Sequence, residues 1–344
     1  MIPSGTCMYK EAGEAAAALR RGETALRTAA ELAVAKLKAR APLFIATSAR
    51  GSSDNAATYA KYMIETSLRI PTLSQAPSLA SIFEAVSPNL REGALLTISQ
   101  SGRSEDLLRT ASAAGKAGAL VIALVNDQAS PLAALAEVVI PLGAGSELSV
   151  AASKSFIASL AALLLLVAKW QGSAELCAAS DGLAPALESA WRKDWSAAVA
   201  PLTKVQSLFV LGRGLTFGVA QEMALKFKET CAIHAEAFST AEVAHGPAAL
   251  IGPGFPVLIV PPPDGAAMGI GEQIAQFRQR GALTFVAGEG FGGDIVLPMD
   301  KDLAPEIFPI AAIQSFYKLV NALALARGRD PDHPPSLRKV TDTR

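Results

Sequence analysis

A polar loop follows an apolar run at residues 95–106, which read LLTISQSGRSED. Its polar positions are Ser99, Gln100, Ser101 and Ser104. If a strand ends here and a helix starts near residue 103, hydroxyls and backbone N–H groups converge at a helix N-terminus with positive potential. Such a loop can hold a dianionic phosphate without many lysines. The same residues also fit a polar turn in which Ser104 caps the helix, and spacing alone does not decide.

Motifs for metals or dinucleotides are not apparent elsewhere in the sequence. Cys7, Cys177 and Cys231 are scattered without metal-ligand spacing, and an odd, sparse cysteine count suits a reducing compartment. We therefore expect chemistry that needs no metal and no cofactor.

Composition narrows the class of protein. Lys plus Arg and Asp plus Glu both number 31, so the formal net charge is zero, which argues against nucleic acid or an anionic membrane as partner. The N-terminus carries charges through its apolar positions, and no signal peptide is apparent. The apolar run 156–168 is shorter than the roughly 20 residues that span a bilayer, so we expect a buried helix. These features predict a soluble, cytoplasmic protein.

The elements that carry the polar loop occur twice. Gly51, after the apolar run LFIATSARG, and Gly214, after LFVLGRG, lie 163 positions apart, and each precedes a helical stretch. Residues 119–127 and 282–290 repeat at the same step. By this step Gly102 corresponds to Gly265, but the matching loop, PPPDG, has no hydroxyls. The repeat predicts one βαβ-type unit used twice, with the phosphate loop only in the first copy.

Short apolar strands alternating with helical patterns predict an α/β protein with two tandem doubly wound parallel sheets. In such sheets ligands bind beyond the carboxyl ends of the strands, where the polar loop lies. The expected segments are a helical arm (1–38), a first domain (39–170), a linker (171–194), a second domain (195–330) and a Pro-rich tail (331–344).

Four stretches together resemble a known family. They are SQSGRSEDL, ARGSSDNAA (49–57), SELSVAASKSF (146–156) and ALKFKETCAIHAEAFSTAEVAHGPAALI (224–251). From about residue 40 to the C-terminus the chain resembles sugar-isomerase (SIS) domain proteins. It is similar to the isomerase half of glutamine–fructose-6-phosphate aminotransferase and to the SIS-type glucosamine-6-phosphate deaminases.

The resemblance implies a role for each matching residue. The polar loop and Ser53, in the GSS turn, would bind the sugar phosphate, and the backbone of Val150 would contact the sugar. Glu229 would move a proton between C1 and C2 of the open-chain sugar. His245 would open the ring, acting in the partner subunit's site of a homodimer. The lysines near the reacting centre would be Lys226 and, in the tail, Lys339.

Simpler interpretations compete with these roles. Glu229 also fits a solvated helix position beside Lys228, and His245 before Gly-Pro also fits a turn. His234 is a second candidate histidine in the same block, whereas His333, between Pro-rich residues, is expected at the surface. Lys339 also fits an ordinary charged tail.

Two positions depart from the aminotransferase pattern: Ala152 replaces a serine and Ala244 a lysine. The short arm also leaves no room for a glutaminase domain, so we expect the ammonia-linked half-reaction rather than glutamine-dependent synthesis. The leading hypothesis is an isomerase-type deaminase that converts glucosamine 6-phosphate to fructose 6-phosphate and ammonia.

Two alternatives remain open. One is a deaminase or isomerase for a galactosamine-type or other phosphosugar. The other is a non-catalytic phosphosugar sensor, although the arm is too short and too acidic for the DNA-binding helices that usually precede such modules.

Overall fold

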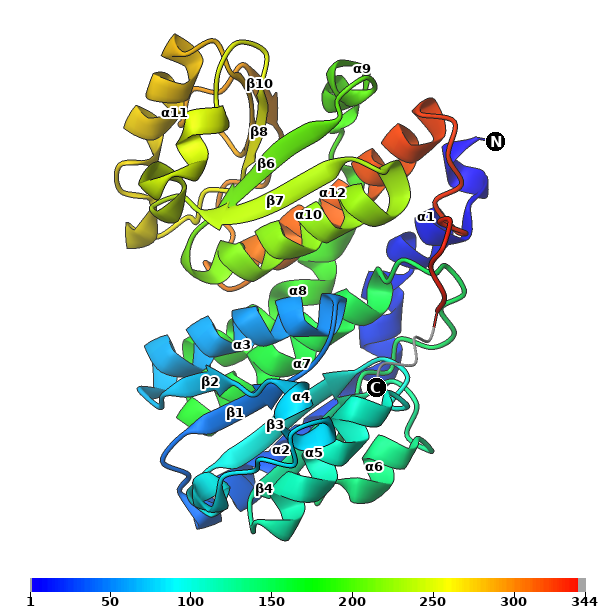
Figure 1. Ribbon diagram of the computed structural model, residues 1–344, viewed down its shortest axis with the longest axis vertical. Coiled ribbons are helices and arrows are strands. Elements are labelled where there is room, and N and C mark those ends of the chain that lie inside the picture. The colour runs from blue at the N-terminus through cyan, green and yellow to red at the C-terminus, as the bar shows by residue number, and fades with distance from the viewer. Residues whose placement is uncertain (1, 340–344) are drawn as a thin grey trace. The chain divides into compact units, whose positions relative to one another are not determined.

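The computed structural model describes residues 2–339. Contacts between Cα atoms divide the chain into two compact units. The N-terminal sheet unit comprises Ala17–Glu147, Lys154–Gly182 and Arg338–Arg344; the C-terminal sheet unit comprises Met1–Ala16, Leu148–Ser153 and Leu183–Leu337. Each unit holds one parallel sheet (Figure 1).

The sheet of the N-terminal unit has the order β2-β1-β3-β4-β5, and all neighbouring strands are parallel. The strands are β1 (Ile45–Ser48), β2 (Thr72–Ser74), β3 (Ala94–Ser99), β4 (Leu120–Val125) and β5 (Val138–Pro141). Successive residues of a strand point to opposite faces, so a continuous apolar run must be covered on both sides. Leu95 packs in a core with residues of α5 (Glu105–Lys116) and α6 (Pro131–Leu135). Leu96 faces residues of α2 (Ala15–Arg40), α3 (Ser52–Leu68) and α7 (Lys154–Gln171). Helices therefore cover both faces.

The sheet of the C-terminal unit has the order β10-β9-β8-β6-β7, again fully parallel. Its strands are β6 (Ser207–Gly212), β7 (His234–Ser239), β8 (Pro256–Ile259), β9 (Leu283–Ala287) and β10 (Ile295–Leu297). Matching β1 to β5 with β6 to β10 gives the same order in both sheets. The repeat predicted from the 163-residue step is therefore confirmed, as are the tandem parallel sheets.

The helices connect and cover these strands. They are α1 (Cys7–Gly13), α2 (Ala15–Arg40), α3 (Ser52–Leu68), α4 (Pro77–Ser81), α5 (Glu105–Lys116), α6 (Pro131–Leu135), α7 (Lys154–Gln171), α8 (Ala174–Arg192), α9 (Val199–Leu202), α10 (Phe217–Cys231), α11 (Ile270–Gln279) and α12 (Phe308–Ala326). Short 3-10 turns are η1 (Pro3–Gly5), η2 (Pro88–Glu92), η3 (Ser196–Ala198), η4 (Gly214–Thr216), η5 (Glu242–His245), η6 (Pro247–Leu250) and η7 (Gly265–Ala267).

The segments expected outside the two sheets are largely helical. The arm contains α1 and most of α2, and the segment 171–194 contains α8, which continues through Pro185. Both α2 and α8 contribute residues to both units. The described part of the tail, through Lys339, contains no helix or strand.

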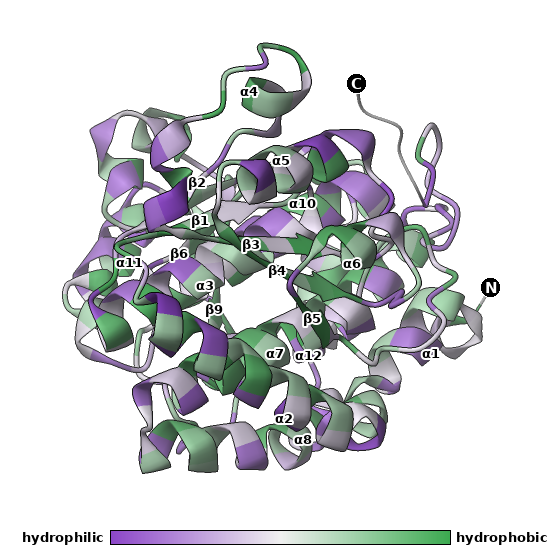
Figure 2. Cartoon of the chain, turned by 90° about the horizontal axis from the view of Figure 1, so that it is seen from below, coloured by the Kyte–Doolittle hydropathy of each residue, from purple (hydrophilic) through white to green (hydrophobic). Residues whose placement is uncertain are grey.

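Two helices, α7 and α12, are long and apolar enough to cross a membrane, but 83% of each apolar window is buried. In the N-terminal unit α7 packs against α3, and in the C-terminal unit α12 packs against α10. The apolar residues of α7 and of the central strands are drawn in green in Figure 2. The run 156–168 is thus a core helix, as its length predicts.

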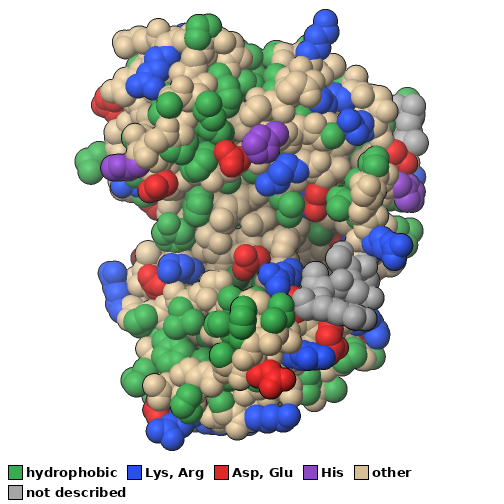
Figure 3. Space-filling view, in the orientation of Figure 1, with side chains coloured by type: hydrophobic (Ala, Val, Ile, Leu, Met, Phe, Trp, Pro, Cys, Tyr) green, Lys and Arg blue, Asp and Glu red, His purple; other side chains and the backbone are tan. Residues whose placement is uncertain are grey.

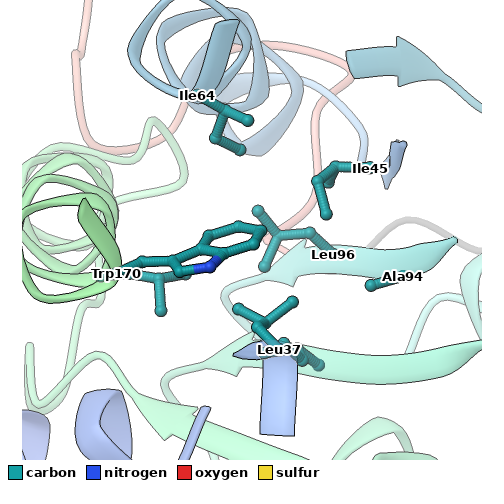
Figure 4. Close-up of a pocket in the computed structure, with 8 residues that line it drawn as sticks. Leu37, Ile45, Ile64, Ala94, Leu96 and Trp170 are labelled. Carbon is teal, nitrogen blue, oxygen red and sulfur yellow. The ribbon is translucent and has the colours of Figure 1, made fainter. Parts of the chain in front are cut away.

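A small apolar cavity of about 10 Å³ lies in the N-terminal unit (Figure 4), with about the room that one water molecule needs. Its lining comes from α2, α3, α7 and three strands: Leu37, Ile45, Ile64, Ala94, Leu96, Ile122, Leu166 and Trp170. Ile45 and Ala94 begin their strands, so the cavity lies away from the carboxyl ends where the polar loop sits. It is a packing gap rather than the candidate site.

Candidate active site

In the first sheet the strand order reverses between β1 and β3. These strands are adjacent and parallel, yet β1 continues outward to β2 while β3 continues to β4 on the other side. A doubly wound sheet with this order binds ligands where the strand order reverses. The turn after β1, which leads to Ser53 in the first turn of α3, and the loop of residues 100–104 after β3 both leave the sheet at this point.

The loop after β3 is held by its own hydroxyls. The buried Ser99 Oγ accepts the Gly102 N–H at 3.0 Å, and the half-buried Ser101 Oγ accepts the Arg103 N–H at 3.4 Å. Gly102 has φ +62°, and a Cβ there would lie 2.2 Å from Ser130 Oγ, so only glycine fits. Ser99 therefore shapes the loop, and Ser101 stands at its half-exposed edge.

Ser104 occupies the N-cap position of α5, but its side chain makes no capping hydrogen bond. Instead Asp106, in the first turn, accepts the Leu107 N–H at 2.8 Å and the Arg50 side chain at 2.8–2.9 Å. Ser104 is thus the N-cap residue of α5, with Glu105 and Asp106 in the first turn, but without the side-chain hydrogen bond of a capping serine.

Helix α10 carries a charged cluster in the C-terminal sheet unit. Lys226 is fully buried, and its Nζ lies 2.5 Å from Glu229 Oε2 and 3.2 Å from Glu222 Oε1. These residues lie three and four positions apart, so they share one helix face. Glu222 is also fully buried, whereas the Glu229 side chain is 22% exposed. Glu229 therefore pairs with the buried Lys226 rather than lying in solvent beside Lys228.

The two carboxylates decide the charge of this lysine. Burial disfavours the charged ammonium, but Glu222 and Glu229 outweigh that effect and raise the pKa of Lys226 above its ordinary value. Lys226 therefore stays protonated between the two carboxylates. Of the three side chains only Glu229 reaches the surface, and a carboxylate that a ligand can reach can act as a general base or acid.

The remaining candidates lie on irregular segments. His245 ends η5, just after β7, and is exposed. All three histidines of the chain, His234, His245 and His333, are exposed, and histidine side chains are visible at the surface in Figure 3. His333 is 79% exposed beside Asp330, which confirms its expected surface position.

Val150 is half-buried, and its N–H donates to the Asp332 carbonyl at 3.1 Å. Of the two departures, Ala152 is half-buried and Ala244 is exposed.

The tail lysine is not an ordinary solvated charge. Lys339 Nζ donates to Glu147 Oε2 at 2.9 Å, and the Glu147 side chain is fully buried. Glu147 also accepts the Ser155 N–H at 3.1 Å and the Ser155 hydroxyl at 2.7 Å. A buried carboxylate with several donors is a firm anchor. The tail is thus held at the start of α7, within the N-terminal sheet unit.

The candidate residues divide between the units. The N-terminal sheet unit carries Ser53, Ser99, Gln100, Ser101, Ser104 and Lys339, and the C-terminal sheet unit carries Val150, Lys226, Glu229 and His245. Among residues 2–339, no group of three or more His, Cys, Asp or Glu side chains is placed to hold a metal ion.

Sequence reasoning missed two carboxylates, Glu222 and Glu147, which pair with the candidate residues Lys226 and Lys339. Glu222 could have been found from its spacing of four to Lys226 on a helix. Glu147, 192 positions from Lys339, gives no such local signal.

Comparison with known proteins identifies the family of this chain. A sequence model described as SIS domain matches residues 43–169 and 201–287. The chain belongs to the SIS domain family. Its curated relatives include the glutamine–fructose-6-phosphate aminotransferases [isomerizing] of Leifsonia xyli and Methanothermobacter thermautotrophicus, at 32% and 34% identity over 84% of this chain. This SIS chain spans about half the length of those relatives (50%).

Solved structures of SIS proteins share the fold over nearly the whole chain. A Silicibacter pomeroyi protein assigned as a phosphosugar isomerase is 41% identical with a TM-score of 0.90, covering 95% of this chain and 100% of that one. The C-terminal domain of glucosamine-fructose-6-phosphate aminotransferase from Francisella tularensis is 25% identical with a TM-score of 0.85, covering 95% and 98%. Glucosamine-6-phosphate deaminase of Thermotoga maritima, at 23% identity and a TM-score of 0.77 (98% and 100%), shares the fold.

Proposed function

We propose that this SIS protein is a cytoplasmic phosphosugar isomerase that deaminates glucosamine 6-phosphate to fructose 6-phosphate and ammonia. In the reaction the C2 proton moves to C1, so that the C2–N bond becomes an imine. Water then adds at C2 and ammonia leaves. The observation that carries the proposal is the buried Lys226 paired with the partly exposed Glu229. The SIS relatives named for fructose 6-phosphate and glucosamine 6-phosphate support this choice of substrate.

The phosphate would bind beyond the carboxyl ends of β1 and β3, where the strand order reverses, through neutral donors. Ser101 and Ser104 supply hydroxyls, and the N-termini of α3 and α5 supply positive potential. Ser53, one residue inside α3, and Gln100, at the end of β3, would complete the cradle. Such a site recognises the phosphate common to many sugars, so the sugar itself must be chosen elsewhere.

The proton transfer would use Glu229 as base and acid. Its carboxylate is partly exposed and can reach a substrate, while the adjacent buried ammonium of Lys226 stabilises negative charge on the sugar oxygen. His245 is exposed on one chain, and we propose that it opens the sugar ring in the site of a partner subunit in a homodimer. Lys339, anchored by Glu147, would close over the substrate.

The test is to incubate the protein with glucosamine 6-phosphate and measure ammonia and fructose 6-phosphate. Glu229→Gln keeps the shape and removes the base, so turnover should fall by about 10²–10⁴-fold while the sugar phosphate still binds. Glu236→Gln, at an exposed position of β7, is the matched control and should retain full activity.

Three other outcomes would overturn the proposal. Equal turnover of Glu229→Gln and wild type would remove Glu229 from the chemistry. Tight binding of glucosamine 6-phosphate, without ammonia release or exchange of the C2 proton with solvent, would indicate a sensor. Faster turnover of galactosamine 6-phosphate would assign the enzyme to the other epimer.

A further inference from the structure

The short segment 148–153 is held by residues far from it in sequence. It belongs to the C-terminal sheet unit, although the residues on both sides of it, Glu147 and Lys154, belong to the N-terminal sheet unit. The Leu148 and Ser149 N–H groups both donate to the Glu11 carboxylate, the second at 3.2 Å. The next N–H, that of Val150, donates to the Asp332 carbonyl at 3.1 Å. Three consecutive backbone donors are thus fixed by two acidic residues.

Asp332 is also bonded to the helix that carries Glu11. The Asp332 carboxylate accepts the Cys7 and Met8 N–H groups, each at 2.7 Å, and so caps α1, the helix that carries Glu11. Segment 148–150, helix α1 and the tail therefore form a closed set of hydrogen bonds. Breaking one member loosens the other two.

Helix α1 is in turn fixed to the core of its unit. Two residues of α12, Asn321 and Gln314, hold it. Thr6 Oγ1 donates to Asn321 Oδ1 at 2.7 Å, and Gln314 Nε2 donates to the Ala12 carbonyl at 3.0 Å. Glu11 and Asp332 are each only 6% exposed. Buried carboxylates that accept two charge-assisted hydrogen bonds hold their donors firmly. Burying two carboxylates costs desolvation free energy, so we expect these contacts to do more than attach the N-terminal helix.

We propose that Glu11, together with Asp332, is a positioning residue that fixes the Leu148–Val150 backbone against the sugar part of the substrate. This inference rests on the proposed function and on the expectation, from the family resemblance, that the backbone of Val150 contacts the sugar. Because the Val150 N–H is already bonded to Asp332, the backbone group that Val150 offers a ligand is its carbonyl. A carbonyl accepts a hydrogen bond from a sugar hydroxyl or amine but cannot bind phosphate. We call the hydrogen bonds from Leu148, Ser149 and Val150 to Glu11 and Asp332 the clamp. The clamp therefore serves sugar recognition and not phosphate binding.

The experiment compares Glu11→Gln with Glu14→Gln, an exposed glutamate just after the same helix. The glutamine keeps one acceptor oxygen but turns an NH₂ group toward the other backbone donor. We expect the KM for glucosamine 6-phosphate to rise about tenfold, the effect of losing one hydrogen bond to a charged group. The inhibition constant of inorganic phosphate should not change. Hydrogen exchange of a peptide spanning 148–150 should become faster in Glu11→Gln, and Glu14→Gln should match wild type.

Ser101→Ala separates failure of this inference from failure of the proposed function. It should weaken both glucosamine 6-phosphate and inorganic phosphate. If Ser101→Ala behaves so, while Glu11→Gln leaves the KM unchanged or weakens both ligands alike, the clamp does not position the sugar. If Glu11→Gln lowers only kcat and the melting temperature, its role is structural and the inference is wrong. If Ser101→Ala affects neither ligand, the phosphate loop itself is misassigned.

Discussion

Replacing Lys226 by methionine should unfold the protein at a markedly lower denaturant concentration. Methionine fills nearly the same volume but removes the ammonium that lies 3.2 Å from Glu222 and 2.5 Å from Glu229. Glu222 is fully buried and loses the ammonium of Lys226, whereas Glu229 is partly exposed and can turn to solvent. The damage should therefore come mainly from Glu222.

The expected loss in the free energy of unfolding follows from the burial of Glu222 and Lys226. Removing one partner of a buried ion pair costs about 3–5 kcal/mol, because the other charge is left uncompensated. Glu222→Gln alone should cost less, about 1–3 kcal/mol, since Lys226 keeps Glu229 as its counter-ion. In the double variant the buried carboxylate is absent when the cation is removed. Its cost should fall at least about 1 kcal/mol below the sum of the two single costs.

The assay is urea unfolding at neutral pH, followed by far-UV circular dichroism, for the wild type, both single variants and the double variant. Lys228→Met provides the control, because Lys228 is an exposed lysine on the same helix and should change stability by no more than about 0.5 kcal/mol. Additive costs of the two single variants would refute the coupling. So would a cost for Lys226→Met equal to that of Lys228→Met.

Three further results are expected. Gly102→Ala should abolish phosphosugar binding, measured by calorimetry, because its Cβ would lie 2.2 Å from Ser130 Oγ at a φ of +62°; wild-type affinity would contradict the loop geometry. Inactive Glu229→Gln and His245→Ala subunits, refolded together, should regain about a quarter of wild-type activity if each site takes one residue from each chain; no recovery in mixed dimers would place both in one chain. Finally, the folded pKa of Lys226 lies above 10.5, so its stabilising effect is complete below that pH and lost as pH rises through the folded pKa; the stability gap between wild type and Lys226→Met should therefore narrow in alkaline urea titrations.

The fold was accessible from sequence because it depends on patterns that are local and repeated. Apolar runs that end in glycine recur after 163 residues, and each run became a strand at the same place in its sheet. The loop after β3 was likewise visible, since a strand end and a helix start must flank it. Its internal hydrogen bonds could not be predicted, because nothing in the sequence shows that Asp106, rather than Ser104, accepts a backbone N–H of the first turn of α5 with its side chain.

The supports of the candidate site could not be predicted, because they join distant parts of the chain. Glu147 meets Lys339, and Glu11 meets Leu148 across 137 positions, without any periodic signal. In the sequence each of these glutamates resembles an ordinary surface charge. Only burial shows that a carboxylate has donors to satisfy, and burial is a property of the folded chain.

The two sheets share one strand order, yet only the first has hydroxyl groups in the loop after its third strand; the second has Pro261–Asp264 there. If only the first copy binds the phosphate, as proposed, the loop after β8 needs no hydroxyls and can hold prolines, while helix α10 of the second copy carries the buried ion pair. The two copies would then differ in chemistry while sharing one architecture. Placing Ser-Gln-Ser-Gly after β8 would test whether the backbone of the second copy can still form a phosphate-binding loop.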